Sequence, residues 1–183
     1  KGGFDLVAQG MSGLMSITGE DKNKPPMKVG APLTDITAGL LAASGILAAI
    51  IHRDKTGEGQ KVDTSLYEAG IIHTYWQSAI AGATGVSPGP LGSAHPLTAP
   101  YQAFKTKDKW ITVGASNQNT WLMLLKAINR EDLNDNEKFS SNASRKKNLN
   151  ELVELLNDEM IKKTSEEWLK IFDKNGLPCG PIN

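Results

Sequence analysis

One carboxylate stands at the start of a long uncharged stretch. After Asp35 no charged residue occurs until Arg53, and the run between them is rich in alanine, leucine and isoleucine. Such a run predicts a helix, whose N-terminal end carries partial positive charge beside Asp35. That position allows two compatible functions for the carboxylate. It can cap the helix by accepting backbone N–H groups, or it can stay ionised as a nucleophile that faces a pocket.

A glycine- and proline-rich stretch holds a second group of candidate residues. Residues 82–100 contain four prolines and follow neither helical nor strand periodicity. Loops of this length inside compact domains are often functional. His95 in this stretch is either a hydrogen-bond donor at a binding site or an exposed linker residue. The other histidines, His52 and His73, are widely spaced from it, so no metal site is predicted.

The first part of the chain is predicted to contain a helix, a strand and a second helix. The helix from Asp35 has basic residues in its last turn and a glycine at position 57 to end it. Residues 60–66 alternate and include β-branched side chains, which predicts a short strand. Residues 67–82 predict the second helix, and both helices are expected to be buried. This order is typical of an α/β layer with a parallel sheet.

The second part is predicted to be a small α+β unit. Residues 101–115 form two alternating runs, which predict a hairpin. A short helix follows, with Asn117 or Asn119 as its cap. Leucines between 149 and 160 follow helical spacing on one face, which predicts another helix. Thr164, with a glutamate three residues on, predicts the capping box of a last helix.

Composition and charge exclude several classes of protein. Hydrophobic residues make up 39% and charged residues 22%, as in a soluble globular protein. The 20 basic and 20 acidic residues balance, so no electrostatic attraction to nucleic acid is expected. The apolar run Ile36–Ile51 is shorter than the roughly 20 residues that cross a bilayer, so no membrane contact is expected. The single cysteine, Cys179, excludes an internal disulfide and fits a reducing compartment.

The residues around Asp35 resemble a known signature. The stretch "GAPLTDITAGLLAASGILAAIIHRDKTGEGQKVDTSL" (residues 30–66) is similar to that of family III CoA-transferases: an aspartate, a helix of small residues, R-x-x-T-G-x-G-Q and V-D-x-S-L. Residues 3–19, 95–121 and 166–183 also resemble segments of this family. Its members are about twice as long, so we expect this chain to be a fragment that lacks an N-terminal half.

The resemblance implies a fold and a division of the chain. The expected fold is α/β: the C-terminal part of a Rossmann-like large domain followed by a small α+β domain, in an interlocked homodimer. Residues 1–82 would belong to the large, CoA-binding domain with the nucleophile helix. Residues 83–100 would be a linker and flap loop, and residues 101–183 the small domain.

The resemblance also implies an activity and its residues. Asp35 would be the nucleophile of an enzyme that moves CoA between an acyl-CoA thioester and a free carboxylic acid. The chain is most similar to members that use succinyl-CoA and dicarboxylates. No tightly bound cofactor and no metal would be needed, and the location would be the cytoplasm, or the mitochondrial matrix in a eukaryote. Residues that would contact CoA are Gly2, Gly3, Phe4 and Asp5. Residues that align with a substrate-binding flap are Gly92, Ser93, Ala94 and His95, and only the first of these keeps the flap's glycine.

Two other functions stay open. Within the same superfamily, 2-methylacyl-CoA racemase pairs its aspartate with a histidine from the preceding segment. Aligned without gaps, residues 3–19 place Ser16 at that position. A serine hydroxyl cannot shuttle protons near neutral pH, which disfavours α-proton racemisation or epimerisation unless the absent half supplies a histidine. The chain could also be a non-catalytic homologue that only binds CoA.

Overall fold

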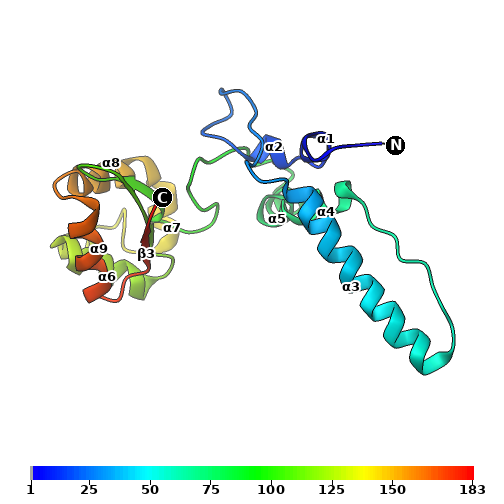
Figure 1. Ribbon diagram of the computed structural model, residues 1–183. Coiled ribbons are helices and arrows are strands. Elements are labelled where there is room, and N and C mark those ends of the chain that lie inside the picture. The colour runs from blue at the N-terminus through cyan, green and yellow to red at the C-terminus, as the bar shows by residue number, and fades with distance from the viewer. Residues whose placement is uncertain (1) are drawn as a thin grey trace. The chain divides into compact units, whose positions relative to one another are not determined.

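The computed structural model describes residues 2–183 (Figure 1). These residues form two compact units, one that ends at Gly92 and one that begins at Ser93. The expected linker, residues 83–100, is therefore divided between the two units. Its second half belongs to the same unit as the predicted small domain.

The first unit is built from helices. They are α1 (Asp5–Met11), α2 (Leu14–Ile17), α3 (Leu33–Thr56), α4 (Leu66–Ile72) and α5 (Tyr75–Thr84). Helices α1 and α4 pack against each other and against the start of α3. Gly70 of α4 makes this approach possible, because a Cβ at that position would collide with the side chain of Ser12 and press closely on that of Thr34. Both buried residues of α3, Thr34 and Ala38, lie at this end of the helix.

Helix α3 begins two residues earlier than expected. Its first residue is Leu33 and its N-cap is Pro32, so Asp35 lies inside the first turn. The predicted end is confirmed: Gly57 adopts a left-handed conformation with φ of 79°, and its N–H donates to the carbonyl of Arg53. Glycine suits this position because it has no Cβ to clash at positive φ.

The expectation that α3 is buried is wrong for residues 2–183. Only Thr34 and Ala38 of this helix are buried, whereas Leu40 and Leu47 are 64% and 62% exposed. The complete helix has 24 residues, and an 18-residue window within it has a mean hydropathy of 1.8. By length and composition the complete helix could cross a membrane. The prediction that it could not was based on the run Ile36–Ile51, which is shorter than the helix.

The predicted strand over residues 60–66 and its parallel sheet are not found among the described residues of the first unit. Residues 57–65 instead run back along α3 without strand pairing (Figure 1). Val62 packs so closely on Gly45 that a Cβ there would lie 2.6 Å from Val62 Cγ1. A strand exists only when a neighbour completes its hydrogen bonds, and local alternation cannot supply that neighbour. The predicted second helix is also divided in two, between His73 and Thr74.

The second unit contains a three-stranded antiparallel sheet in the order β1-β2-β3. The strands are β1 (Tyr101–Lys105), β2 (Trp110–Gly114) and β3 (Cys179–Pro181). Phe104 pairs with Ile111 across the predicted hairpin, which is confirmed. Strand β3 was not predicted. Its three residues are too few to show alternation, and its partner, Ile111 to Val113, lies far away in sequence.

Helices complete the second unit. They are α6 (Gln118–Ile128), the 3-10 helix η1 (Glu131–Asn134), α7 (Asn142–Lys147), α8 (Leu149–Met160) and α9 (Ser165–Lys174). The predicted caps are confirmed, since Asn117 and Thr164 each form a capping box with the residue three positions on. The hydrophobic core of this unit includes Phe104, Ile111, Trp121, Leu152, Leu156 and Phe172.

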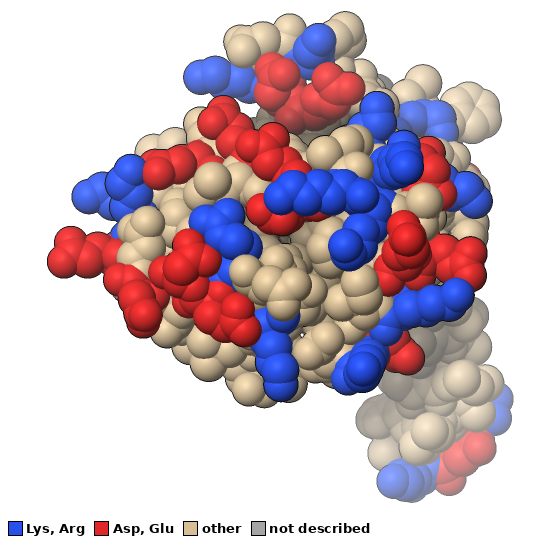
Figure 2. Space-filling view, turned by 90° about the vertical axis from the view of Figure 1, so that its left-hand side faces the viewer, with Lys and Arg blue, Asp and Glu red and all other residues tan. Residues whose placement is uncertain are grey.

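Charges of both signs alternate over the surface shown in Figure 2. Several form exposed ion pairs, such as Lys138 with Glu151 and Lys170 with Glu166. Such pairs contribute little to stability, typically ~0–1 kcal/mol. On this face the mixture leaves no broad basic area of the kind that binds a nucleic-acid backbone.

Candidate functional site

Asp35 is the third residue of α3, and its side chain is exposed. Within residues 2–183 its carboxylate has no hydrogen-bond or ion-pair partner. The capping function expected as one alternative is therefore not what this side chain does. The result is an accessible carboxylate that a reactant can approach.

Asp5 satisfies the helix start in place of Asp35. Its Oδ1 accepts hydrogen bonds from the backbone nitrogen of Thr34 at 3.0 Å and from Thr34 Oγ1 at 2.8 Å. Gln9 donates to the other carboxylate oxygen, Oδ2, at 2.8 Å. Thr34 and Gln9 are fully buried. A carboxylate from α1 is thus joined to the first turn of the helix that carries Asp35.

The environment of Asp5 keeps it ionised. Partial burial alone raises the pKa of this carboxyl group, but the hydrogen bonds from Thr34 and Gln9 outweigh it. Lys28 adds a favourable charge, and the pKa lies below its ordinary value. The charged form is therefore the one that the fold stabilises.

The four predicted CoA-contacting residues separate into different surroundings. Gly2 and Gly3 line a largely apolar cavity of about 310 Å³. Phe4 is 81% exposed, and the Asp5 carboxylate faces α3 instead. Sequence reasoning missed the rest of the cavity wall, which α1 and the start of α4 supply. Its members include Val7, Met11, Leu66 and Tyr67. In the sequence, these apolar residues could not be told apart from those of any other amphipathic helix.

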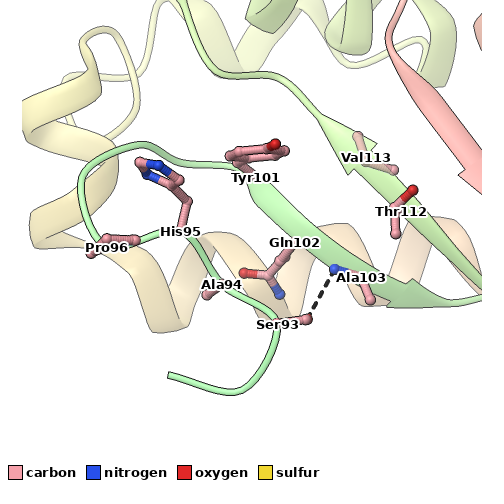
Figure 3. A pocket seen from close by; sticks show the side chains of 9 residues that line it. All are labelled: Ser93, Ala94, His95, Pro96, Tyr101, Gln102, Ala103, Thr112 and Val113. Atoms are coloured by element: carbon pink, nitrogen blue, oxygen red, sulfur yellow. Dashed lines mark hydrogen bonds between the residues drawn. The ribbon is translucent and has the colours of Figure 1, made fainter. Parts of the chain in front are cut away.

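A second cavity, of about 460 Å³, lies wholly in the second unit (Figure 3). Three of the four predicted substrate-binding residues line it: Ser93, Ala94 and His95. Gly92 does not, because it ends the first unit, where its N–H donates to the carbonyl of Gly19. The strands add further polar groups that the sequence did not reveal. They are Tyr101 and Gln102 of β1 and Thr112 of β2.

The loop that carries His95 is tied to the adjacent strand. The backbone nitrogen of Ala103 donates to Ser93 Oγ at 3.0 Å, which Figure 3 shows as a dashed line. The backbone nitrogen of His95 donates to the carbonyl of Tyr101, also at 3.0 Å. The rings of His95 and Tyr101 lie 5.2 Å apart. These contacts make the loop a fixed wall of the cavity.

Helix α7 holds the other end of this loop. Lys146 Nζ donates to the carbonyl of His95 at 3.2 Å. Asn142 accepts from the backbone nitrogen of Ala99 and donates to the carbonyl of Leu97. The buried Arg145 donates to the carbonyl of Ala99 at 2.8 Å. The sequence did not predict this arrangement. Helix α7 has only six residues, and they are mostly polar, so they show no helical periodicity of apolar side chains.

Hydrogen bonding fixes the tautomer of His95. Its Nδ1 accepts from the backbone nitrogens of Leu97 at 3.1 Å and Thr98 at 3.2 Å. An amide N–H can only donate, so Nδ1 carries no proton and the neutral ring is protonated at Nε2. Burial, and next the charge of Lys146, lower the pKa of this imidazole from its ordinary value. His95 is thus a neutral ring whose Nε2–H is a hydrogen-bond donor.

Comparison with known proteins identifies the family. The model of CoA-transferase family III matches residues 1–183. The chain is 36% identical over 183 residues to the succinyl-CoA:glutarate CoA-transferase of Homo sapiens. The alignment covers 100% of this chain and 42% of that relative. It is 33% identical to the succinate–glutarate CoA-transferase of Agrobacterium fabrum, with coverage of 99% and 45%. The chain belongs to CoA-transferase family III, and it spans less than half the length of these relatives.

Solved structures agree with this assignment. A CAIB/BAIF family protein from Brucella suis superimposes with a TM-score of 0.80 at 33% identity, and the match covers 100% of this chain and 48% of that one. A Mycobacterium tuberculosis protein gives a TM-score of 0.85 at 26% identity, with coverage of 100% and 47%. The chain is therefore a partial CoA-transferase fold of mixed α and β structure. Since these matches span the whole chain, α3 has a counterpart within that fold.

Proposed function

We propose that this chain provides the nucleophile of a CoA-transferase, which moves CoA from an acyl-CoA thioester to a free carboxylic acid. The observation that carries the proposal is the Asp35 carboxylate, exposed and unpartnered in the first turn of α3 in a chain of this family. A carboxylate in this position is accessible to a substrate, as a nucleophile must be.

The first half of the reaction transfers CoA to the enzyme. An oxygen of Asp35 attacks the thioester carbonyl of the donor, the carbon–sulfur bond breaks, and CoA leaves as a thiolate. The product on the enzyme is a mixed anhydride between Asp35 and the donor acyl group. The thiolate then attacks the Asp35 carbonyl of this anhydride. The donor acid departs as a carboxylate, and CoA is left as a thioester on Asp35.

The second half repeats these steps with the acceptor. The acceptor carboxylate attacks the Asp35 thioester and releases CoA thiolate, which forms a second anhydride. The thiolate attacks the acceptor carbonyl, and acyl-CoA and free Asp35 are formed. Every nucleophile is an anion that the preceding step releases or that enters as substrate, so no net proton transfer is needed. Covalent catalysis divides one difficult exchange into easier steps.

We further propose that the substrates are dicarboxylic, with succinyl-CoA as donor. The names of the human and Agrobacterium relatives point to this class for those proteins. In this chain, the polar residues His95, Gln102 and Tyr101 line the cavity of the second unit, and we propose that this cavity binds a carboxylate. We propose that the complete protein, in the cytoplasm or mitochondrial matrix, adds a Rossmann-like sheet to the first unit and forms an interlocked homodimer.

The test is to trap the covalent intermediate on the full-length enzyme. After mixing with succinyl-CoA, mass spectrometry of the intact protein and its peptides is expected to find an adduct on Asp35. Asp35→Asn is expected to abolish both the adduct and CoA transfer to glutarate. Asp54→Asn, an exposed aspartate at the other end of α3, is the matched control and is expected to keep both.

Two outcomes would overturn the proposal. One is normal transfer by Asp35→Asn. The other is exchange of α-hydrogen for solvent deuterium in an acyl-CoA without any acceptor acid, which would indicate a racemase or epimerase.

A further inference from the structure

We propose that Asp5 is a positioning residue for the nucleophile: it orients Asp35 by holding the first turn of α3 through Thr34. This inference rests on the proposed function, because it concerns how the nucleophile of that reaction is held. It also replaces the CoA contact that the family resemblance suggested for Asp5.

The first support is the geometry at Thr34. Both of its polar donors, the backbone N–H and the hydroxyl, bind the same oxygen of Asp5, at 3.0 and 2.8 Å. Two hydrogen bonds from one residue fix both the backbone and the side chain of Thr34. Asp35 is the next residue, and in a helix the direction of each Cα–Cβ bond is set by the backbone of its neighbours. The hold on Thr34 therefore fixes where the Asp35 side chain emerges.

The second support is that Asp5 is itself held. Gln9, one helical turn further along α1, donates to Asp5 Oδ2 at 2.8 Å. The carbonyl oxygen of the Gln9 side chain accepts from the backbone nitrogen of Val29 at 2.9 Å. Gln9 is fully buried, so this link is shielded from water. One network thus joins α1, the segment that leads into α3, and the first turn of α3.

The third support is that the carboxylate oxygens of Asp5 already have hydrogen-bond donors within the protein. Gly2 and Gly3, in contrast, line the neighbouring cavity. The two interpretations make different kinetic predictions. A CoA contact at Asp5 would govern CoA affinity, whereas a positioning residue governs how fast the Asp35 adduct forms.

The experiment compares Asp5→Ala and Asp5→Asn in the full-length enzyme. Adduct formation with succinyl-CoA is followed by rapid quench and mass spectrometry, and the Kd of CoA by calorimetry. Asp5→Ala is expected to slow adduct formation on the order of tenfold to a hundredfold, as for a misplaced reacting group. The Kd of CoA is expected to change by less than about twofold, well under the tenfold that corresponds to 1.4 kcal/mol. Asp5→Asn keeps an oxygen that can accept from Thr34, and is expected to recover most of the rate.

Thr34→Val serves as the second variant in case Asp5→Ala does not fold. Valine removes one of the two hydrogen bonds and preserves shape, so a smaller slowing is expected, again with CoA affinity kept. The inference is overturned if Asp5→Ala weakens CoA binding and leaves the adduct rate unchanged, or if neither quantity changes. Asp35→Asn separates the two proposals: if it keeps full turnover, the proposed function fails. If it is inactive while Asp5 and Thr34 variants match the wild type, only the positioning function of Asp5 fails.

Discussion

The ammonium group of Lys146 lies 3.2 Å from the backbone carbonyl oxygen of His95, although 51 residues separate them in sequence. This bond joins α7 to the loop that forms one wall of the larger cavity. It also places a positive charge near the imidazole of His95, which lowers its pKa in addition to the effect of burial. Lys146 therefore acts on both the position and the protonation of His95.

Replacement of this lysine is expected to change how the enzyme responds to pH. Lys146→Met removes the neighbouring charge, so the pKa of His95 rises towards its ordinary value. Protonation of Nδ1 breaks the hydrogen bonds from Leu97 and Thr98, and it then occurs at higher pH than in the wild type. The measurement is the pH dependence of KM for the acceptor acid. Lys147→Met, at the exposed neighbouring position of α7, is the control, and an identical profile for the two variants would contradict the expectation.

Arg145 has no ionic partner among residues 2–183, and it is expected to stabilise the second unit through hydrogen bonds. It is buried, and it donates to the carbonyls of Ala99 and Phe139 while it lies over the ring of Trp121. Arg145→Met removes the donor to these two backbone carbonyl groups and to the side-chain oxygen of Gln118, and a buried acceptor left without a donor costs about 1–3 kcal/mol. Urea denaturation of the full-length protein is expected to show a lower midpoint. Arg145→Lys is expected to rescue only part of it, because an ammonium lacks the planar fork of the guanidinium. A wild-type midpoint for Arg145→Met would contradict this function.

Two glycines in helices are expected to respond in opposite directions to alanine. Gly70 faces Ser12 and Thr34, and a Cβ at this position leaves no room for them. Gly70→Ala is expected to lower the melting temperature and to slow adduct formation, because it disturbs the packing at the start of α3. Gly39 of α3 has nothing within 4 Å of such a Cβ. Gly39→Ala is expected to be neutral, or stabilising by up to about 1 kcal/mol. Equal melting temperatures for the two variants would argue against the close approach of α4.

Asp108 is expected to make stability depend on pH in the acid range. Its carboxylate accepts from the backbone nitrogen of Ser165 at 2.8 Å and from Thr106 Oγ1 at 2.9 Å, which joins the hairpin turn to α9. The hydrogen bond from Ser165 is the main cause that lowers the pKa of Asp108 below its ordinary value, 3.8.

Since the folded-state pKa lies below the unfolded one, this contribution is complete above the unfolded pKa and is lost as pH falls through the folded pKa. Thermal unfolding between pH 7 and pH 3 is expected to show a weaker pH dependence in Asp108→Asn than in the wild type. Asp158→Asn, on the exposed face of α8, is the control. The same slope in Asp108→Asn and the wild type would show that Asp108 does not contribute.

Features set by nearby residues could be predicted from the sequence. The capping boxes at Asn117 and Thr164 involve residues only three positions apart, and the β1-β2 hairpin is closed by its own turn. The position of Asp35 near the start of a long helix was predicted in the same way, whereas its exposure was not. Its exact place in the first turn was not, because the acceptor for the Thr34 N–H is Asp5, 29 residues earlier.

The rest of the candidate site depends on distant partners. Asn142, Arg145 and Lys146 act on a loop more than 40 residues earlier, and no local pattern marks them as its support. The predicted strand at residues 60–66 failed for a related reason: alternation gives a segment the tendency to pair, but the neighbour that would complete the hydrogen bonds is not among residues 2–92. The expectation of a buried α3 came from its apolar composition. Composition shows that a helix has apolar surface to bury, but it does not show which other part of the protein packs against that surface.

The two amide hydrogens at His95 Nδ1 give the ring a fixed polarity. Because the lone pair of Nδ1 accepts from the amides of Leu97 and Thr98, the proton of the neutral imidazole lies on Nε2. To reverse this polarity, both amides would have to move away from the ring. The orientation of the ring is therefore set by the backbone of the loop as well as by the histidine itself.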